Sequence, residues 1–334
     1  MSPTLSVVLP NFNHARFIGE ALKAITGQSL KPHEVIVIDD ASTDNSVEVI
    51  QGFAMHWPFV KLVQNPKNAG VVYSCNRGIR MASGDYVLSS AADDIILPGL
   101  LEKSIALLAQ YPQAGLCSTG SLLIGEHGED KGSFHLPDIS DTACFISPEN
   151  AIKLLKRHGG WFMGNTTIYR RQAFLDAGGF IPELHSFSDG FISLVIALKH
   201  GVCFIPEPLA AWRRMGGGYS SQTAVNTKMA LSIIDHAEHL METVYKDIFP
   251  AEYALQCQRR LFFDFFDAWA RSQRAGIAGL RTRLPSPTIV DRVFFNWMIV
   301  LRWIDYGIIK IYLFSRLRFS MQWEILKRKF KISL

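Results

Sequence analysis

Residues 35–44 of the sequence read VIVIDDASTD. The first four residues of this stretch are apolar and β-branched, which is typical of a strand buried on both faces. The strand is expected to end at the two aspartates, 39–40. Residues 42–44, Ser-Thr-Asp, are types that cap helices, so a helix is expected to begin there and to run to residue 53. A buried strand that leads directly into a helix indicates a βαβ unit and a parallel sheet.

The same alternation of strands and helices continues on both sides of this stretch. Short apolar runs predict three more strands, at 5–9, 61–63 and 86–88. Apolar residues at helical spacing predict helices over 17–25, 71–82 and 100–110. Polar clusters follow the four strands, at 11–13, 39–40, 65–70 and 93–94. Because ligands of parallel sheets bind beyond the carboxyl ends of the strands, the sequence predicts a binding site at that edge.

The composition narrows the class of protein. With 48% hydrophobic and 19% charged residues, the chain is an ordinary globular protein. Its five cysteines are scattered and form no C-x-x-C pair, which argues against a zinc site or a disulfide framework. No basic segment followed by an apolar core is visible at the start, so the protein is expected to stay in the cytoplasm. The net charge of +4 is too small to indicate a nucleic-acid partner.

Five motifs together resemble the family 2 glycosyltransferases of the GT-A fold. They lie at 7–13, 35–44, 68–70, 84–86 with 93–94, and 178–180 with 188–189. Each motif alone is a weak signal, but five in this order and spacing are a strong one. The resemblance implies an α/β, Rossmann-like GT-A domain over residues 1–221, with a mainly parallel central sheet flanked by helices. It also implies inverting transfer of a sugar from a nucleotide-diphosphate donor to an acceptor hydroxyl.

The resemblance also implies a set of donor-binding residues. They are Pro10, Asn11, Phe12, Asp40, Asn68, Arg77, Asp93, Arg213 and Arg214. A uracil ring offers a flat face and an N–H donor, which the Phe12 ring and the Asp40 carboxylate could bind, so a UDP-sugar is the expected donor. Arg77 suits a diphosphate because its guanidinium is planar and permanently charged. Considered alone, each of these residues could instead have only a structural role, in the core, in a turn or on the surface of a helix.

The expected metal site departs from the family pattern. The family usually shows D-x-D-D after its strand, whereas this chain has Ala91-Ala92-Asp93-Asp94 and lacks the first acid. Mg²⁺ and Mn²⁺ often use only one or two protein carboxylates, together with phosphates and water. Asp93 and Asp94 are therefore the expected metal ligands, and Mn²⁺ or Mg²⁺ the expected cofactor. The alternative is that the two aspartates only cap the helix that follows.

Inverting transfer needs a general base that takes the proton of the acceptor hydroxyl. Asp189 matches the position of the family's base, and Ser188 stands where the family usually has glutamate. Asp189 also precedes an apolar helix, so a role as helix N-cap is the alternative.

A second family segment follows at residues 212–214, Trp-Arg-Arg, which resembles the loop that closes over the phosphates. Met215 replaces the usual histidine, which leaves Arg213 and Arg214 as the expected phosphate contacts. The three glycines at 216–218 would make this loop mobile.

Residues 222–334 are expected to form a helical region with a basic, aromatic tail. Two long helices on either side of Pro250 and a last helical segment over about residues 290–318 are predicted. The apolar stretch 293–314 is not expected to span a membrane, because Arg302, Asp305 and Lys310 interrupt it. We favour a helix on an anionic membrane surface over a helix that packs on the catalytic domain or on a second subunit. The aromatic residues expected at headgroup level are Trp297, Trp303, Tyr306, Tyr312 and Trp323.

The expected function is inverting, metal-dependent sugar transfer in cell-surface polysaccharide or glycolipid synthesis. The partners would be a nucleotide-diphosphate sugar and a glycan or glycolipid acceptor, and an oligomer stays open. The expected place is the cytoplasm, including the inner face of the cytoplasmic membrane. One alternative is a non-catalytic nucleotide-sugar or glycan-binding relative, suggested by the missing acid at Ala91. Another is a polyprenyl-phosphate sugar synthase, which shares the catalytic half but normally has membrane spans.

Overall fold

The computed structural model describes residues 3–134, 136–272 and 283–300, together with residues 309, 312, 313 and 316. The strands in these ranges are β1 (Leu5–Asn11), β2 (Glu34–Asp39), β3 (Val60–Gln64), β4 (Tyr86–Ser89), β5 (Ile95–Ile96), β6 (Leu116–Ile124), β7 (Asp130–Ser133), β8 (Cys144–Ile146), β9 (Ile168–Arg170) and β10 (Val202–Arg213). The helices are α1 (Ala15–Thr26), α2 (Ser46–His56), α3 (Val71–Met81), α4 (Leu100–Gln110), α5 (Pro148–His158), α6 (Arg171–Asp176), α7 (Ser188–His200), α8 (Tyr219–Val225), α9 (Thr227–Glu242), α10 (Tyr253–Ser272) and α11 (Ile289–Val300), with 3₁₀ turns η1 (Gly164–Thr166) and η2 (Pro182–Phe187).

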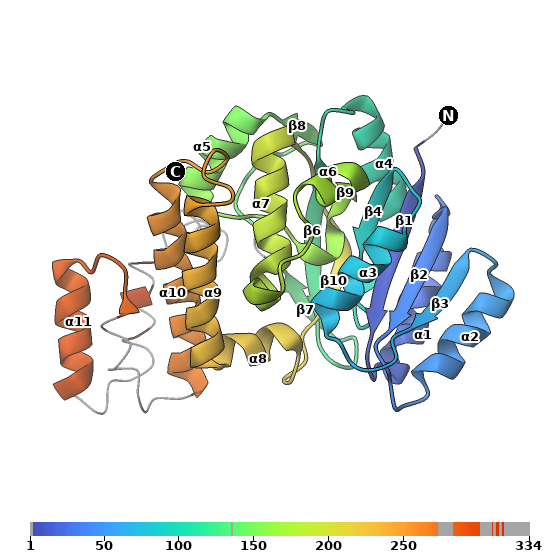
Figure 1. The fold of residues 1–334 in the computed structure, drawn as a ribbon, viewed down its shortest axis with the longest axis horizontal. Helices are drawn as coiled ribbons and strands as arrows, with labels where there is room; N and C mark the ends of the chain where they lie inside the picture. The colour runs from blue at the N-terminus through green and yellow to red at the C-terminus, as the bar shows by residue number, and fades with distance from the viewer. Residues whose placement is uncertain are drawn as a thin grey trace. The chain divides into compact units, whose positions relative to one another are not determined.

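The strands form one sheet in the order β3-β2-β1-β4-β9-β6-β10-β5, with β7 beside β6 and β8 beside β10. The four strands predicted from the sequence pair in parallel and lie side by side in Figure 1. β9 runs antiparallel to both β4 and β6, and β5 runs antiparallel to β10. The predicted fold class, α/β with a mostly parallel central sheet flanked by helices, is therefore confirmed. The antiparallel strands β5 and β9 are not among the four strands that the apolar runs predict.

The central strands are buried on both faces, as their continuous apolar runs predict. Every residue of β2 is buried. Val35 and Val37 belong to the core that also holds residues of α1, α2 and α4, whereas Ile36 and Ile38 pack with Ala82 at the end of α3. Gly78 lets α3 approach the sheet closely, because a Cβ there would collide with Val8. The two helical layers hold the four strand ends in register.

The predicted helix start at residue 42 is wrong, because α2 begins at Ser46. The capping residues of this stretch instead bind their neighbours across the sheet. Ser42 Oγ donates to Asp39 Oδ1 at 2.6 Å. Asp44 Oδ2 accepts the Ala15 N–H at 2.9 Å, at the start of α1, and Asp44 Oδ1 accepts the Ser46 N–H at 3.0 Å, at the start of α2. One carboxylate therefore binds the first N–H groups of two helices.

The chain divides into two compact units. The first consists of Met1–Leu155, Gly160–Pro182 and Phe187–Met215 and contains the sheet. The second consists of Lys156–Gly159, Glu183–Ser186 and Gly216–Leu334, within which α9 and α10 pack together. The helices predicted on either side of Pro250 correspond to α9 and α10. In the described part of the chain, no helix has both the length and the apolar character needed to cross a bilayer.

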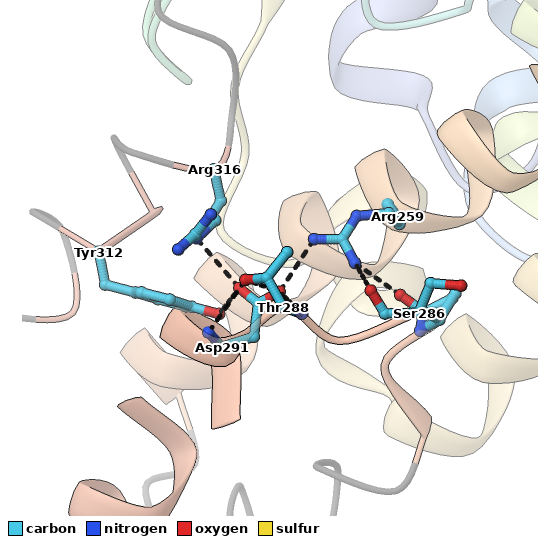
Figure 2. A network of polar contacts seen from close by, with 7 residues as sticks. Arg259, Ser286, Thr288, Asp291, Tyr312 and Arg316 are labelled. Carbon is cyan, nitrogen blue, oxygen red and sulfur yellow. Dashed lines mark hydrogen bonds and ion pairs between the residues drawn. The ribbon is translucent and has the colours of Figure 1, made fainter. Parts of the chain in front are cut away.

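A buried carboxylate organises the second unit around α11 (Figure 2). Asp291 is fully buried, and its Oδ2 accepts hydrogen bonds from Thr288 and from Arg259 Nη2. Its Oδ1 accepts the Tyr312 hydroxyl at 2.8 Å and pairs with Arg316 Nε at 3.0 Å. Burial raises the pKa of Asp291, but the hydrogen bonds from Thr288, Tyr312 and Arg259 outweigh it and hold the pKa below its ordinary value.

This network corrects the expected role of Tyr312 and occupies Arg316, one of the basic residues of the tail. Tyr312 is 6% exposed and stacks on Phe294 with ring centroids 3.5 Å apart, so it is an internal residue rather than a headgroup contact. Arg316 is paired with Asp291 and is not a free cation for lipid. Trp297, by contrast, is 61% exposed. The other aromatic residues assigned to the membrane surface, Trp303, Tyr306 and Trp323, lie outside the described residues.

Acid should destabilise the first unit through Glu34, at the start of β2. Burial raises the pKa of this carboxyl, but hydrogen bonds from Lys61, Ser83 and Ser6 outweigh it and hold the pKa at about 2, against an ordinary 4.5. A depressed pKa adds stability above the ordinary value, and this stability is lost as pH falls from about 4.5 towards 2. Glu34→Gln should therefore lower the free energy of unfolding on the order of 3 kcal/mol near neutral pH.

Urea unfolding of both proteins over a pH series measures this difference. The gap between wild type and Glu34→Gln should close as the solution becomes acidic. Glu48→Gln, an exposed position on α2, is the matched control and should leave the curve unchanged. A gap that is constant across pH would contradict the assignment.

Candidate active site

The ends of β1 and β2 are tied together by buried side chains. Asn11 Nδ2 donates to Asp39 Oδ1 at 2.9 Å and to Ser42 Oγ at 3.1 Å. Asn11 Oδ1 is buried and has no hydrogen-bond partner in the described part of the chain. The next side chain, Phe12, is 41% exposed and offers a ring face at this strand end. Pro10 is half-buried beside it.

The Asp40 carboxylate holds the loop that follows β3. Its Oδ1 accepts Asn65 Nδ2 at 2.6 Å and the Ala69 N–H at 2.9 Å, and its Oδ2 accepts the Gly70 N–H at 2.8 Å. Asp40 is 3% exposed. A carboxylate has about four acceptor positions, so one remains for a donor such as a base N–H. The structure therefore gives Asp40 a loop-supporting role that the sequence did not indicate.

Asn68 and Arg77 flank this loop. Asn68 is exposed, and its Oδ1 accepts the Gly70 N–H at 3.1 Å, in a turn where Gly70 has a φ of 90° that favours glycine. Arg77 Nη1 donates to the Gln64 carbonyl and to Asn65 Oδ1. Among the described residues, Arg77 Nε and Nη2 have no acceptor. An arginine anchored through one nitrogen with the others unbound is well placed to bind an anion.

The acidic pair lies between β4 and β5, where β10 approaches it. The short antiparallel pairing of β5 with β10 brings residue 213 next to the acids. The Arg213 N–H donates to Asp94 Oδ1 at 2.8 Å, and Arg213 Nε donates to the Asp93 carbonyl at 2.8 Å. The Asp93 carboxylate has no hydrogen-bond partner in the described ranges and is half-buried. Neither aspartate caps α4, whose N-cap is Gly99.

Arg213 is not placed as the sequence suggested. It is 4% exposed, its Nη2 donates to Glu20 Oε2 at 2.6 Å, and its guanidinium lies 4.9 Å from the Phe17 ring centroid. Its Nη1 donates to the carbonyls of residues 125 and 126. Because every guanidinium nitrogen is occupied by protein, this placement favours support of the acidic pair over a phosphate contact. Arg214 is exposed and stacks on Trp212 at 4.5 Å, so its charge remains accessible.

The acidic pair fits a divalent cation. Asp94 is 5% exposed, and burial together with the nearby Asp93 carboxylate raises the pKa of Asp94 to about 8. A cation between the two carboxylates would remove this repulsion and favour both charged forms. Across the described ranges, no three His, Cys, Asp or Glu side chains gather as a metal cluster. The remaining ligands would therefore come from diphosphate oxygens and water, as is usual for Mg²⁺.

Asp189 lies in the first turn of α7 and keeps one carboxylate oxygen unbound. Its Oδ1 accepts the Gly190 N–H at 2.7 Å, whereas its Oδ2 has no hydrogen-bond partner among the described residues. Burial raises the pKa of Asp189. Asp189 is not the N-cap of α7, which is Phe187, although its bond to Gly190 satisfies one N–H of the first helical turn. An unbound oxygen on a carboxyl with a raised pKa suits a general base.

One turn that the sequence did not single out touches both acidic groups. Gly164, the first residue of η1, lies against Asp189 Oδ2, where any Cβ would overlap with that oxygen. The next residue, Asn165, donates Nδ2 to Ser121 Oγ at 3.4 Å, and its side chain lowers the pKa of the nearby Asp94 carboxyl. Thr166 fixes the turn through bonds to β6. The structure therefore brings Asp94 and Asp189, 95 residues apart in sequence, close to consecutive residues of one turn.

Comparison with known proteins agrees with the fold and identifies the family. Residues 6–176 match the family model described as glycosyl transferase family 2. Glycosyltransferase GlyG of Streptococcus pneumoniae serotype 4 is 33% identical over 229 residues, which are 65% of this chain and 73% of GlyG. The chain spans between half and about three quarters of the length of the first two curated relatives it matches.

Two solved structures share the fold. S. aureus TarS 1-349, solved with UDP-GlcNAc, has a TM-score of 0.54 at 17% identity over 83% of both chains. The mannosyltransferase PcManGT from Pyrobaculum calidifontis, solved with GDP-Man and Mn²⁺, has a TM-score of 0.57 at 18% identity. The match covers all of this chain and 89% of the PcManGT chain. With its family model over half the chain and a GT-A architecture, this protein belongs to glycosyl transferase family 2 and is a glycosyltransferase.

Proposed function

We propose that this chain transfers a sugar from a UDP-sugar to an acceptor hydroxyl with inversion at the anomeric carbon. The observation that carries the proposal is the η1 turn, because Gly164 lies against Asp189 Oδ2 and the next residue, Asn165, lies near Asp94. Consecutive residues of one turn thus approach a group that can hold the diphosphate side of a donor and a group that can take a proton. Residues 1–221 form the catalytic domain in this proposal.

The acceptor hydroxyl would lie against Asp189 Oδ2, the oxygen that has no protein partner. As its oxygen forms the new bond to the anomeric carbon, its proton passes to Asp189, and the bond from that carbon to the diphosphate breaks. The electron pair leaves with the nucleoside diphosphate. A divalent cation held by Asp93 and Asp94, when bound, supplies positive charge against the departing diphosphate. Arg77 and Arg214 add fixed positive charge for the same phosphates.

The donor site we propose is formed by the strand ends. Phe12 offers its exposed ring to the base, Asp40 offers its remaining acceptor position, and Arg77 offers two free guanidinium nitrogens. Pro10, Asn11 and Asn68 complete its edge. The two structural neighbours bind UDP-GlcNAc and GDP-Man respectively. The choice of uridine for this chain rests on the exposed ring of Phe12 and the remaining acceptor position of Asp40.

A nucleotide panel tests the donor. UDP with Mn²⁺ should raise the melting temperature of the full chain, because a ligand that binds only the folded state stabilises it by mass action. GDP, CDP and ADP with Mn²⁺ should stabilise less, and UDP with EDTA should stabilise less than UDP with Mn²⁺. Equal shifts with all four diphosphates would remove the case for a uridine site.

The acceptor and location complete the proposal. We propose a glycan or glycolipid of the cell envelope as acceptor and the cytoplasm as location, with peripheral attachment to the inner face of the cytoplasmic membrane. The absence of an acid at Ala91 keeps a non-catalytic binding protein as the competing function. Release of free sugar from the UDP-sugar, measured without acceptor, separates these two functions. A transferase slowly hydrolyses its donor under this condition, whereas a binding protein leaves the donor intact.

A further inference from the structure

Helix α11 carries an exposed apolar face. Four of its side chains are apolar and largely open to solvent: Ile289 at 80%, Val290 at 54%, Val293 at 47% and Trp297 at 61% exposure. At about 100° per residue, these four positions fall within an arc of roughly 100°, so they form one continuous stripe. We call these four side chains the outer face of α11. A stripe of this kind on a helix is typical of a docking surface.

The opposite side of α11 is fixed, so the outer face cannot turn inward. Asp291 binds Thr288, Arg259, Tyr312 and Arg316 (Figure 2). Breaking a buried pair of this kind leaves an uncompensated charge, which is strongly unfavourable.

Aromatic packing holds the same inner side. Phe294 stacks on Tyr312, and Phe295 packs edge-on against Phe262 and Phe266. The inner aromatic residues and the outer apolar stripe are thus separate sets, and the exposure of the outer face is built into the packing of the helix.

Positive charge on α11, and in the sequence that follows it, indicates which kind of partner the outer face would bind. Arg292 is exposed on α11 itself. Residues 301–334 follow α11 in the sequence and contain eight Lys or Arg, of which Arg316 is paired with Asp291, and only two Asp or Glu, although the whole chain carries a net charge of only +4. An apolar stripe that contains Trp297, on a helix that exposes Arg292 and precedes this basic sequence, matches a bilayer surface that contains anionic lipid.

We propose that the outer face of α11 docks onto an anionic lipid surface, with Val293 and Trp297 entering the headgroup layer. This inference deepens the peripheral location in the proposed function by naming the surface that makes the contact. It differs from the sequence expectation, because Tyr312 and Arg316 hold α11 from inside instead of contacting lipid. It does not depend on the chemistry of sugar transfer, so the two can fail separately.

Co-sedimentation of the full chain with vesicles tests the proposal. Wild-type protein should sediment with vesicles of phosphatidylcholine and phosphatidylglycerol, should sediment less with phosphatidylcholine alone, and should be released by added salt. The double variant Val293→Ser with Trp297→Ser should bind anionic vesicles at least about tenfold more weakly, because it loses the apolar stripe but keeps every charge. Val244→Ser, which removes an apolar side chain 66% exposed in the same unit, is the matched control and should bind like wild type.

Two further measurements make the result decisive. The melting temperature and UDP binding of the double variant should equal those of wild type, since both substituted side chains are exposed and lie outside the donor site. Sedimentation velocity without lipid tests a second copy of the chain as the occupant. The proposal is overturned if wild type stays in the supernatant with anionic vesicles, if the double variant binds them as well as wild type, or if the outer face mediates a dimer that ignores lipid.

Discussion

Asp189→Asn should slow sugar transfer by about 10²-fold or more, the usual scale for loss of a general base, while UDP-sugar affinity stays nearly constant. The substitution is nearly isosteric, and the Gly190 N–H can still bind Oδ1, as it does at 2.7 Å in the wild-type chain. What is lost is the ability of Oδ2 to take a proton. Because that step occurs on the way to the transition state, ground-state binding of the donor should change little.

A second variant tests the same assignment through the backbone. Gly164→Ala places a Cβ where Asp189 Oδ2 lies, so the carboxylate must move away from the acceptor. Transfer should fall while donor binding persists. Asp176→Asn, on the exposed surface of α6, is the matched control and should keep wild-type transfer.

The pH profile gives an independent reading of Asp189. The base must be ionised to take a proton, so the transfer rate should fall as pH drops through its pKa. Burial raises the pKa of Asp189, so the acid limb should lie above the ordinary 3.8 of an aspartate. The acid limb should disappear in Asp189→Asn. Wild-type transfer rates in Asp189→Asn would end the assignment, and loss of donor binding would make Asp189 a binding residue instead.

Asp94→Asn should abolish the Mn²⁺-dependent part of UDP binding and reduce transfer by a further large factor, about 10²-fold or more. The asparagine keeps an oxygen for the Arg213 N–H, which now donates to Asp94 Oδ1 at 2.8 Å, so the β5–β10 contact should survive. Only the negative charge is removed. Asp93→Asn should have a similar effect on metal dependence, because the Asp93 carboxylate has no other partner among the described residues.

The measurement is UDP affinity with Mn²⁺ and with EDTA for each variant. Wild type should lose affinity in EDTA, and both variants should bind with the EDTA value under either condition. Asp130→Asn, an exposed acid on β7, is the control and should behave as wild type. If both Asp93→Asn and Asp94→Asn keep Mn²⁺-dependent affinity, the metal assignment is wrong.

Much of the fold of the sheet-containing unit could be predicted, because the sequence patterns that indicate its strands and helices are local. Four short apolar runs are strands, helices separate them, and the chirality of βαβ connections then places their carboxyl ends on one edge. The structure places Phe12 and Asp40 directly after β1 and β2, and Asp93 after β4, while their role as a donor site stays a prediction. The boundaries were less accurate, and α2 begins only at Ser46, because Ser42 binds Asp39 and Asp44 binds the first N–H groups of both α1 and α2.

The hydrogen-bond and ion-pair partners of the side chains could not be predicted in the same way. Arg213 reads from sequence as a free cation, but β10 pairs with β5 and carries it under the acidic pair, 119 residues away in the chain. Asp40 reads as a free carboxylate, but three donors from residues 65–70 occupy it. Tyr312 and Arg316 read as tail residues, yet both bind the buried Asp291. In each case the partner is distant in sequence, and the periodicity of hydrophobic residues does not predict such a contact.

The sequence by itself determined the family, the α/β class and the strand ends at which the polar residues lie, because these follow from hydrophobic periodicity and from motifs within short segments. Only the tertiary structure decided which acids act together. Gly164 lies against Asp189 and Asn165 lies near Asp94 because β4, β6 and β10 pack around one turn, and neither residue stands out in the sequence. The same holds for α11, whose exposed stripe became visible only when Asp291 and its partners fixed which side of the helix faces inward. Packing of segments far apart in the chain, rather than local propensity, sets these arrangements.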